Sequence, residues 1–257
     1  MRITQCRYDE KRIDKFKYFL HDNQLKDYHD LHAPAIFFGL YSTSCFKTLK
    51  AHKGLSIVIW RGTDLLKKNR LKNVAGLKGK NIRHVAISSF IADDLKGVKL
   101  RYKFIPIPGV KIDDIPVEKL GNEVYAYMSA KRTNFYGGPI LDYVKKHIPF
   151  KMNINSSCNK YTRDQLMEVY KNSFIGLRLT QHDGIANQVV ELGMMGRKCI
   201  HNGNHPNAIR WKRAKDIIKT ITQEGEKVGQ INKDLSDEVK KYINVGKDWL
   251  NTEYWKG

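Results

Sequence analysis

The amino-acid sequence predicts an α/β protein with two parallel sheets that are covered by helices. Short apolar runs such as 35–41 and 55–60 are continuous rather than alternating, as in strands buried on both faces. Amphipathic stretches with helical spacing separate these runs. Between Pro106 and Pro116, prolines and a glycine interrupt the pattern, which then restarts. The sequence therefore predicts two α/β units joined by a proline-rich linker.

The first unit is predicted from runs too short and too rich in β-branched or aromatic residues to be helices. The predicted strands are 35–41, 55–60, 84–88 and 103–107, and the predicted helices are 43–52 and 89–95. The helix at 43–52 is expected to end near Gly54, since glycine favours a helix end. We expect His84, Trp60 and the pair Phe37 and Phe38 to be core residues.

The second unit is predicted from the same alternation. The predicted strands are 124–129, 150–155, 175–180 and 198–201, and the predicted helices are 138–147, one that starts at 162, and 184–195. Thr162 and Gln165 have the spacing of a capping box. The tail has a helical apolar stripe that should pack back on the body. The predicted domains are 1–118, 119–232 and a C-terminal helix, 233–257, that packs toward the first domain.

The chain is strongly basic. Its 257 residues include 46 Lys and Arg against 26 Asp and Glu, a net charge of +20. Such a charge attracts polyanions such as nucleic acid, anionic lipid or phosphorylated small molecules. A compositional bias toward lysine would produce the same excess. Seven basic residues lie between Arg61 and Lys80 with one acid, Asp64, so this segment is a candidate surface for an anionic partner.

Several protein classes are disfavoured. No apolar stretch approaches the ~20 residues that span a bilayer, and the N-terminus has charges where a signal peptide has an apolar segment. We therefore expect a cytoplasmic protein. The cysteines are far apart and form no CxxC pair, which argues against a zinc site or a disulfide framework; they are Cys6, Cys45, Cys158 and Cys199.

The segment 175–196 carries the most chemical information. A strand is followed by a turn at Gly184, and a helix begins where Asp183 is placed to cap it. The amino end of such a helix is a phosphate site. Glu191 follows eight residues later, about two turns along, so both carboxylates are expected on one side, where they could accept hydroxyls of a sugar nucleotide. The plainer alternative is that Asp183 only caps the helix and Glu191 is solvated.

This segment resembles the donor-binding motif of retaining GT-B glycosyltransferases of the group-one or family-four type. That motif has two glutamates separated by seven residues, and here Asp183 and Glu191 take their places before Leu-Gly-Met-Met-Gly. Tyr136-Gly-Gly-Pro resembles the turn after the first strand of the C-terminal domain. Trp60-Arg-Gly-Thr-Asp64 is similar to an N-terminal motif in which histidine is common at the position of Arg61. The resemblance spans roughly 55–200.

The resemblance implies a GT-B fold, in which two Rossmann-like domains face each other across a cleft, with a shortened N-terminal domain. It implies that Glu191 binds ribose hydroxyls and that Asp183 binds the transferred sugar. The helix start at Gly184 and Ile185 would bind the diphosphate, and its charge would be neutralised by Arg178, Lys131 and Arg132. Asp64 and His182 are further catalytic candidates; the alternatives are a turn residue for Asp64, which we prefer to a catalytic base, and a plain loop residue for His182. No metal and no cofactor are expected, and the donor is expected to be a UDP- or GDP-sugar.

The acceptor stays open at this stage. A glycan, glycolipid or glycoprotein acceptor is the first expectation, with peripheral contact to an anionic membrane surface as one option. A hydroxymethylated base in DNA is a second option, because the basic segment could follow phosphates. A non-catalytic nucleic-acid-binding module is a rival from another class, whereas a sugar-nucleotide epimerase is disfavoured because we identify no matching histidine and acid set.

Overall fold

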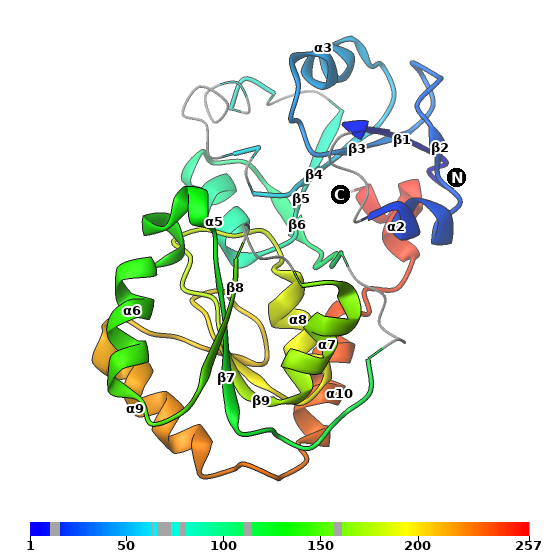
Figure 1. The fold of residues 1–257 in the computed structure, drawn as a ribbon. Coiled ribbons are helices and arrows are strands. Elements are labelled where there is room, and N and C mark those ends of the chain that lie inside the picture. The colour runs from blue at the N-terminus through cyan, green and yellow to red at the C-terminus, as the bar shows by residue number, and fades with distance from the viewer. Residues whose placement is uncertain are drawn as a thin grey trace. The chain divides into compact units, whose positions relative to one another are not determined.

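The computed structural model describes residues 1–10, 16–62, 64–65, 73, 75–77, 81–109, 115–156 and 161–256. The chain divides into two compact units (Figure 1). The first unit comprises Met1–Lys111, Asp183–Ile185 and Val245–Gly257, and the second comprises Ile112–His182 and Ala186–Asn244. The change between units after Lys111 falls within the predicted proline-rich linker.

The first unit contains a six-stranded sheet in which every pairing is parallel. The strand order is β2-β1-β3-β4-β5-β6. The strands are β1 (Gln5–Tyr8), β2 (Lys26–Asp27), β3 (Ala35–Phe38), β4 (Ser56–Trp60), β5 (Ile82–Ala86) and β6 (Tyr102–Phe104). The α-helices described are α2 (Lys17–Asp22), α3 (Thr43–Ala51) and α5 (Ser89–Gly97). The four strands and two helices predicted for this unit are all present, with shifted ends.

Both faces of this sheet are packed, as its continuous apolar strands predict. Every residue of β3 and β4 is buried. Successive side chains of a strand point to opposite faces, so Phe37 contacts the ring of His52 while Phe38 contacts the rings of Phe16 and Phe19. The prediction that Trp60 and the pair Phe37 and Phe38 are core residues is confirmed.

Strand β1 is not predicted by the sequence pattern, because Gln5, Arg7 and Tyr8 make it polar. Gln5 is nevertheless fully buried. Its amide nitrogen donates to the carbonyls of Asp30 and Ala33, and its amide oxygen accepts from the N–H groups of His29 and Asp30. Burial of a polar side chain is tolerated when its hydrogen bonds are satisfied, and this network fixes the 29–33 loop beside β1.

The end of the chain is part of the first unit. Two short 3-10 helices, η4 (Asp248–Leu250) and η5 (Thr252–Trp255), carry the buried side chains Trp249, Leu250 and Trp255. The N–H of Ile3 donates to the carbonyl of Leu250 at 2.8 Å. Helix α10 (Lys233–Ile243), by contrast, packs on a helix of the second unit. The return to the first unit therefore begins at Val245, later than the predicted boundary at 233.

His84 is a buried core residue of β5, as expected. The indole N–H of Trp60 donates to its Nδ1 at 3.2 Å. Burial, with a smaller contribution from Arg83, lowers the pKa of His84 from 6.5 to about 4. The folded state therefore binds the imidazole proton more weakly than the unfolded state does.

This difference predicts a stability that depends on pH. The contribution of neutral His84 is fully present above pH 6.5 and is lost as the pH falls toward 4. Between pH 7 and pH 5, the free energy of unfolding of the first unit should fall by roughly 2 kcal/mol from this group. Urea denaturation at both pH values measures this fall. In His84→Gln the fall should be smaller by roughly 2 kcal/mol, whereas in the exposed control His147→Gln it should equal that of the wild type. An unchanged pH dependence in His84→Gln would contradict the assignment.

The second unit contains a five-stranded parallel sheet in the order β11-β10-β9-β7-β8. Its strands are β7 (Glu123–Met128), β8 (Met152–Ser156), β9 (Ser173–Leu177), β10 (Lys198–Ile200) and β11 (Ala208–Ile209). Its helices are α6 (Gly138–His147), α7 (Arg163–Lys171), α8 (Asn187–Met194), α9 (Ala214–Gly225) and α10, together with the 3-10 turns η2 (Ala130–Arg132) and η3 (Asn134–Tyr136). The predicted strands and helices are present, and the capping box of Thr162 and Gln165 is confirmed.

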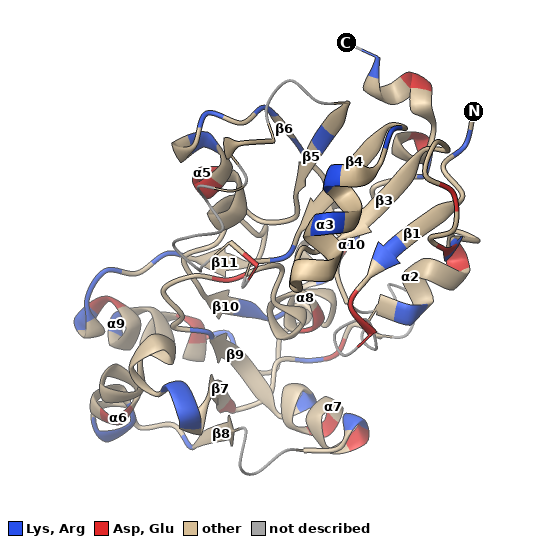
Figure 2. Ribbon diagram, turned by 90° about the horizontal axis from the view of Figure 1, so that it is seen from above, with Lys and Arg blue, Asp and Glu red and all other residues tan. Residues whose placement is uncertain are grey.

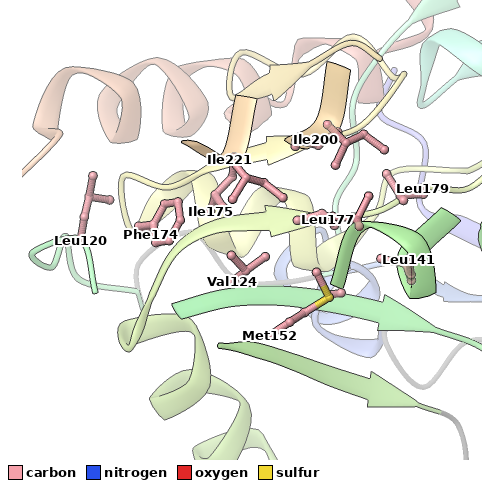
Figure 3. Close-up of a cluster of buried hydrophobic side chains, with 13 residues drawn as sticks. Leu120, Val124, Leu141, Met152, Phe174, Ile175, Leu177, Leu179, Ile200 and Ile221 are labelled. Carbon is pink, nitrogen blue, oxygen red and sulfur yellow. The ribbon is translucent and has the colours of Figure 1, made fainter. Parts of the chain in front are cut away.

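Helices cover both faces of this sheet (Figure 1). Helices α6 and α9 pack together on one face, and α7, α8 and α10 lie on the other. Between the sheet and the pair α6 and α9 lies a core that includes Val124, Leu141, Leu177 and Ile221 (Figure 3). In sequence order within the unit the strands run 2-1-3-4-5, a doubly wound order. The order reverses between β7 and β9, and ligands of such sheets bind at this point, outside the carboxyl ends of the strands.

The buried arginine Arg197 ties the opposite, amino-terminal end of the second sheet together. Its guanidinium is fully buried and donates only to backbone carbonyls among the contacts described. The acceptors come from the segment before β7, the end of α7, the start of β9 and the end of α8: Glu118, Lys119, Tyr170, Lys171, Ser173 and Met195. Burial lowers the pKa of Arg197 to about 10, so it remains charged at neutral pH.

The predictions on membrane spans, cysteines and the basic segment can be compared only with the residues that the structure describes. Among the described residues, no helix is long and apolar enough to cross a membrane. The cysteines Cys6, Cys45 and Cys199 are buried free thiols, and Cys158 lies outside the described residues. Of the basic residues between Arg61 and Lys80, only Arg61 is described.

Candidate functional site

A candidate anion site lies at the carboxyl edge of the second sheet, where the strand order reverses. Arg178 directly follows β9, and its guanidinium lies 4.8 Å from the ring centre of Tyr127 on β7 and 4.9 Å from that of Tyr136. It also donates to Oε1 of Gln188 at 3.2 Å. The two rings and the amide hold a cation at the position where a parallel sheet of this order binds ligands.

The turn before α6 places Tyr136 in this site. Gly137 has a φ of 69° and ends η3. A Cβ at Gly137 would come within 2.9 Å of the carbonyl oxygen of Leu179, in the loop after β9. Glycine is therefore required both by the left-handed backbone and by the close approach of the two loops, which explains the Tyr136-Gly-Gly-Pro motif in structural terms.

Helix α8 starts at the same edge but three residues later than predicted. It begins at Asn187, its N-cap is Ala186, and no side chain caps it. Asp183 therefore lies before the helix and does not cap it, so the predicted cap and the shared helix face of Asp183 and Glu191 are wrong. The side chain of Gln188 is buried, and its Nε2 has no hydrogen-bond partner among the described residues. Such groups are rare and indicate a missing polar partner.

Glu191 projects from α8 into a buried polar cluster. Only 4% of its side chain is exposed, and its Oε1 accepts a hydrogen bond from the guanidinium of Arg163 at the start of α7. The alternative that Glu191 is a solvated helix residue is therefore wrong. The rings of Tyr125 and Tyr170 lie edge to face at 4.9 Å beside it. Burial raises the pKa of both phenols, that of Tyr125 to about 12, and the charge of Glu191 raises both further.

Two further predicted cations follow β7 toward the same edge. Lys131 and Arg132 form most of η2 and are exposed. The guanidinium of Arg132 lies 4.1 Å from the ring centre of Phe135. Figure 2 shows that Lys and Arg also occur on outer helices of both units, so positive charge is not confined to this edge.

The remaining motif residues are divided between the units. Asp183, Gly184 and Ile185 belong to the first unit, where the carbonyl of Asp183 accepts a hydrogen bond from Oγ of Ser88 at 2.9 Å. His182 belongs to the second unit, and its carbonyl accepts from the hydroxyl of Thr180. The structure thus brings Arg178 and Glu191 into one unit and places Asp183 in the other.

Asp64 has a structural role. It is fully buried, and its carboxylate accepts hydrogen bonds from the N–H groups of Arg61 at 3.1 Å and Leu40 at 3.4 Å. Burial raises its pKa, while these hydrogen bonds oppose that rise. The expectation that Asp64 is a catalytic residue lining a cleft is therefore corrected, because its carboxylate is enclosed and stabilises the turn after β4.

Sequence reasoning missed three residues of the site. Tyr127 and Arg163 contact Arg178 and Glu191, respectively, across long stretches of sequence. Gln188 lies within the segment 175–196, ten residues after Arg178, but nothing in the local pattern indicates its contact with that arginine. The capping box predicts the start of α7 at Arg163, but it does not predict the contact of Arg163 with Glu191. In the part of the chain that the structure describes, no group of three or more His, Cys, Asp and Glu is arranged to hold a metal ion.

Comparison with known proteins gives the fold. Neither protein-family models nor curated proteins match the sequence. The structure is similar to Anabaena HepE in complex with UDP and glucose, with a TM-score of 0.62, 9% identity, and coverage of 94% of this chain and 88% of HepE. It is also similar to TarM, with a TM-score of 0.60, 13% identity, and coverage of 93% of this chain and 56% of TarM. The chain has the GT-B fold.

A third similar structure is a glycosyltransferase from Rickettsia africae, with a TM-score of 0.58 and 11% identity. That comparison covers 99% of this chain and 96% of the Rickettsia protein. The chain thus spans little more than half the length of TarM but nearly the whole length of the Rickettsia enzyme. With identities this low, the likeness establishes the fold rather than the substrate.

Proposed function

We propose that this protein is a glycosyltransferase that moves a sugar from a nucleotide-sugar donor to a hydroxyl acceptor. The observation that carries the proposal is that one Rossmann-like unit places a cation, Arg178, directly after β9, and a buried carboxylate, Glu191, on the following helix α8, where the strand order reverses. Arg178 donates to Gln188 of α8, and Glu191 lies on the same helix. A cation would suit the diphosphate of a nucleotide, and a carboxylate would suit its ribose hydroxyls. The GT-B fold is consistent with this use of the site.

Each group has a chemical role in the proposed reaction. Glu191 accepts hydrogen bonds from the ribose hydroxyls, and the amino end of α8 faces the diphosphate. Arg178, with Lys131 and Arg132, neutralises the charge that develops on the leaving diphosphate. Cations placed in this way perform that task without a metal ion.

The remaining assignments rest on the resemblance to the group-one enzymes. They are transfer of a hexose or pentose with retention of configuration, a UDP- or GDP-sugar donor, and roles at the transferred sugar for Asp183 and His182. Gly184 and Ile185 would complete the diphosphate site in that scheme. A glycan, glycolipid or glycoprotein remains the first proposal for the acceptor, with modified DNA as the alternative.

Binding of nucleoside diphosphates tests the proposal. Isothermal titration with UDP and GDP should give binding of at least one of them to the wild type. In Arg178→Ala that affinity should fall about 10- to 100-fold, because charge-assisted hydrogen bonds to phosphate contribute about 1.5–3 kcal/mol. The matched control is Arg210→Ala, which removes an exposed arginine of the same unit and should bind as wild type. Equal affinity in Arg178→Ala would contradict the proposed diphosphate site.

A further inference from the structure

Arg163 is not required by the helix that carries it. It is the first residue of α7, and the capping box made by Thr162 and Gln165 already satisfies that helix end. A cation at the amino end of a helix is opposed by the helix dipole. Arg163 nevertheless directs its guanidinium to Glu191, a residue 28 positions away on another helix. The contact therefore serves the carboxylate rather than the helix.

The carboxylate depends on this partner. The side chain of Glu191 is 4% exposed whereas that of Arg163 is 47% exposed, so the arginine joins a buried carboxylate to the surface. A buried carboxylate without a cationic or hydrogen-bonding partner is costly. Tyr125 and Tyr170 surround the group, and burial keeps both phenols protonated. Arg163 is the cation that contacts this carboxylate in the described structure.

The bond from Arg163 also has a direction. The guanidinium donates to Oε1 of Glu191. A hydrogen bond to one oxygen restrains the rotation of the carboxylate, and the second oxygen, Oε2, has lone pairs that can accept further hydrogen bonds. Ordering of this kind before a ligand arrives lowers the free-energy cost of binding.

We propose that Arg163 is a positioning residue for the nucleotide ribose, which holds Oε1 of Glu191 so that Oε2 is presented to the ribose hydroxyls. The inference rests on the proposed function and adds a residue to it. Because Arg163 acts through Glu191, its effect on nucleotide affinity must depend on the ribose hydroxyls that donate to Glu191. A nucleotide that lacks the 2′-hydroxyl should therefore be much less sensitive to Arg163.

A double-mutant-style cycle measures this dependence. Titrations of UDP, GDP, 2′-deoxy-UDP and 2′-deoxy-GDP into wild type and Arg163→Gln would be compared. For the ribonucleotide that the wild type binds, Arg163→Gln should weaken binding about 10-fold, and for its 2′-deoxy form less than about 3-fold. Arg163→Lys should recover most of the loss, because a lysine can also donate to Oε1.

Two controls separate positioning from folding. Arg213→Gln removes an exposed arginine that borders the start of α9 and pairs with Asp216, and it should leave all four affinities unchanged. The circular dichroism spectrum of Arg163→Gln at the titration temperature should match that of the wild type, because the capping box of α7 is retained. Its melting temperature should be lower, because the buried carboxylate of Glu191 loses its cation.

The outcomes that overturn the inference are distinct from failure of the proposed function. Wild-type affinity in Arg163→Gln would overturn the role of Arg163 and leave the proposed function standing. An equal loss for the ribonucleotide and its 2′-deoxy form would show that Arg163 acts independently of the ribose, which also overturns the inference. If the wild type binds neither UDP nor GDP, the proposed donor site fails, and the inference fails with it.

Discussion

Replacement of Arg197 by methionine is expected to lower the free energy of unfolding of the second unit by about 3–5 kcal/mol. Methionine fills a similar volume but removes one donor from each of six backbone carbonyls, of which those of Tyr170, Ser173 and Met195 keep a backbone N–H donor. Each buried acceptor that loses its partner costs about 1–3 kcal/mol, and the costs are not additive, because some carbonyls regain water. The guanidinium also joins the segment before β7 to the ends of α7 and α8.

Urea denaturation would measure the loss of stability, and hydrogen exchange would show where in the unit it occurs. Exchange should become faster at the amino-terminal end of the second sheet, where β7 and β9 begin, while the first unit is unaffected. Arg210→Met is the matched control, since Arg210 is exposed in the same unit, and its stability should change by less than about 0.5 kcal/mol. A similar small change in Arg197→Met would contradict the structural role given to the buried guanidinium.

Truncation of Trp249 to alanine is expected to destabilise the first unit by about 3–5 kcal/mol. The indole is 3% exposed, and its ring stacks on Phe19 of α2 with ring centres 5.9 Å apart. The carbonyl of the same residue accepts the indole N–H of Trp255 at 2.7 Å. Loss of the side chain thus opens a cavity between α2 and the C-terminal segment and loosens the backbone that pairs with Ile3.

Hydrogen exchange resolved along the chain would localise this effect. Protection should be lost in β1 and α2, although they lie more than 200 residues before Trp249 in the sequence, and the second unit should keep its protection. Tyr254→Ala removes a neighbouring aromatic side chain that is 40% exposed and serves as the control. If Trp249→Ala were as stable as Tyr254→Ala, the C-terminal segment would not be part of the first unit's core.

Much of the fold could be predicted because a strand that is buried on both faces of a sheet has a continuous apolar sequence. Strands β3 and β4 lie in continuous apolar runs that are shorter than a typical helix and rich in β-branched or aromatic residues. Strand β1 has no such apolar run. Its Gln5 is buried only because four backbone hydrogen bonds from the 29–33 loop satisfy its amide, and those partners cannot be inferred from spacing.

The same distinction applies to the candidate site. Glu191 and Arg178 could be singled out because they lie in one local motif that links a strand to a helix. Arg163 could not, since it contacts Glu191 from another helix, 28 positions earlier in the sequence. The sequence left both a catalytic role and a turn role open for Asp64, because a carboxylate after a strand has the same sequence pattern whether it faces a ligand or the backbone N–H groups of its own turn.

The most direct test of the central claim is a crystal structure of the protein with UDP or GDP bound. The account predicts the diphosphate at Arg178, beside the start of α8, and the ribose hydroxyls within hydrogen-bonding distance of Glu191. Density for the nucleotide at another surface, with the carboxylate of Glu191 making no contact with it, would contradict the claim that this edge of the second sheet is the donor site.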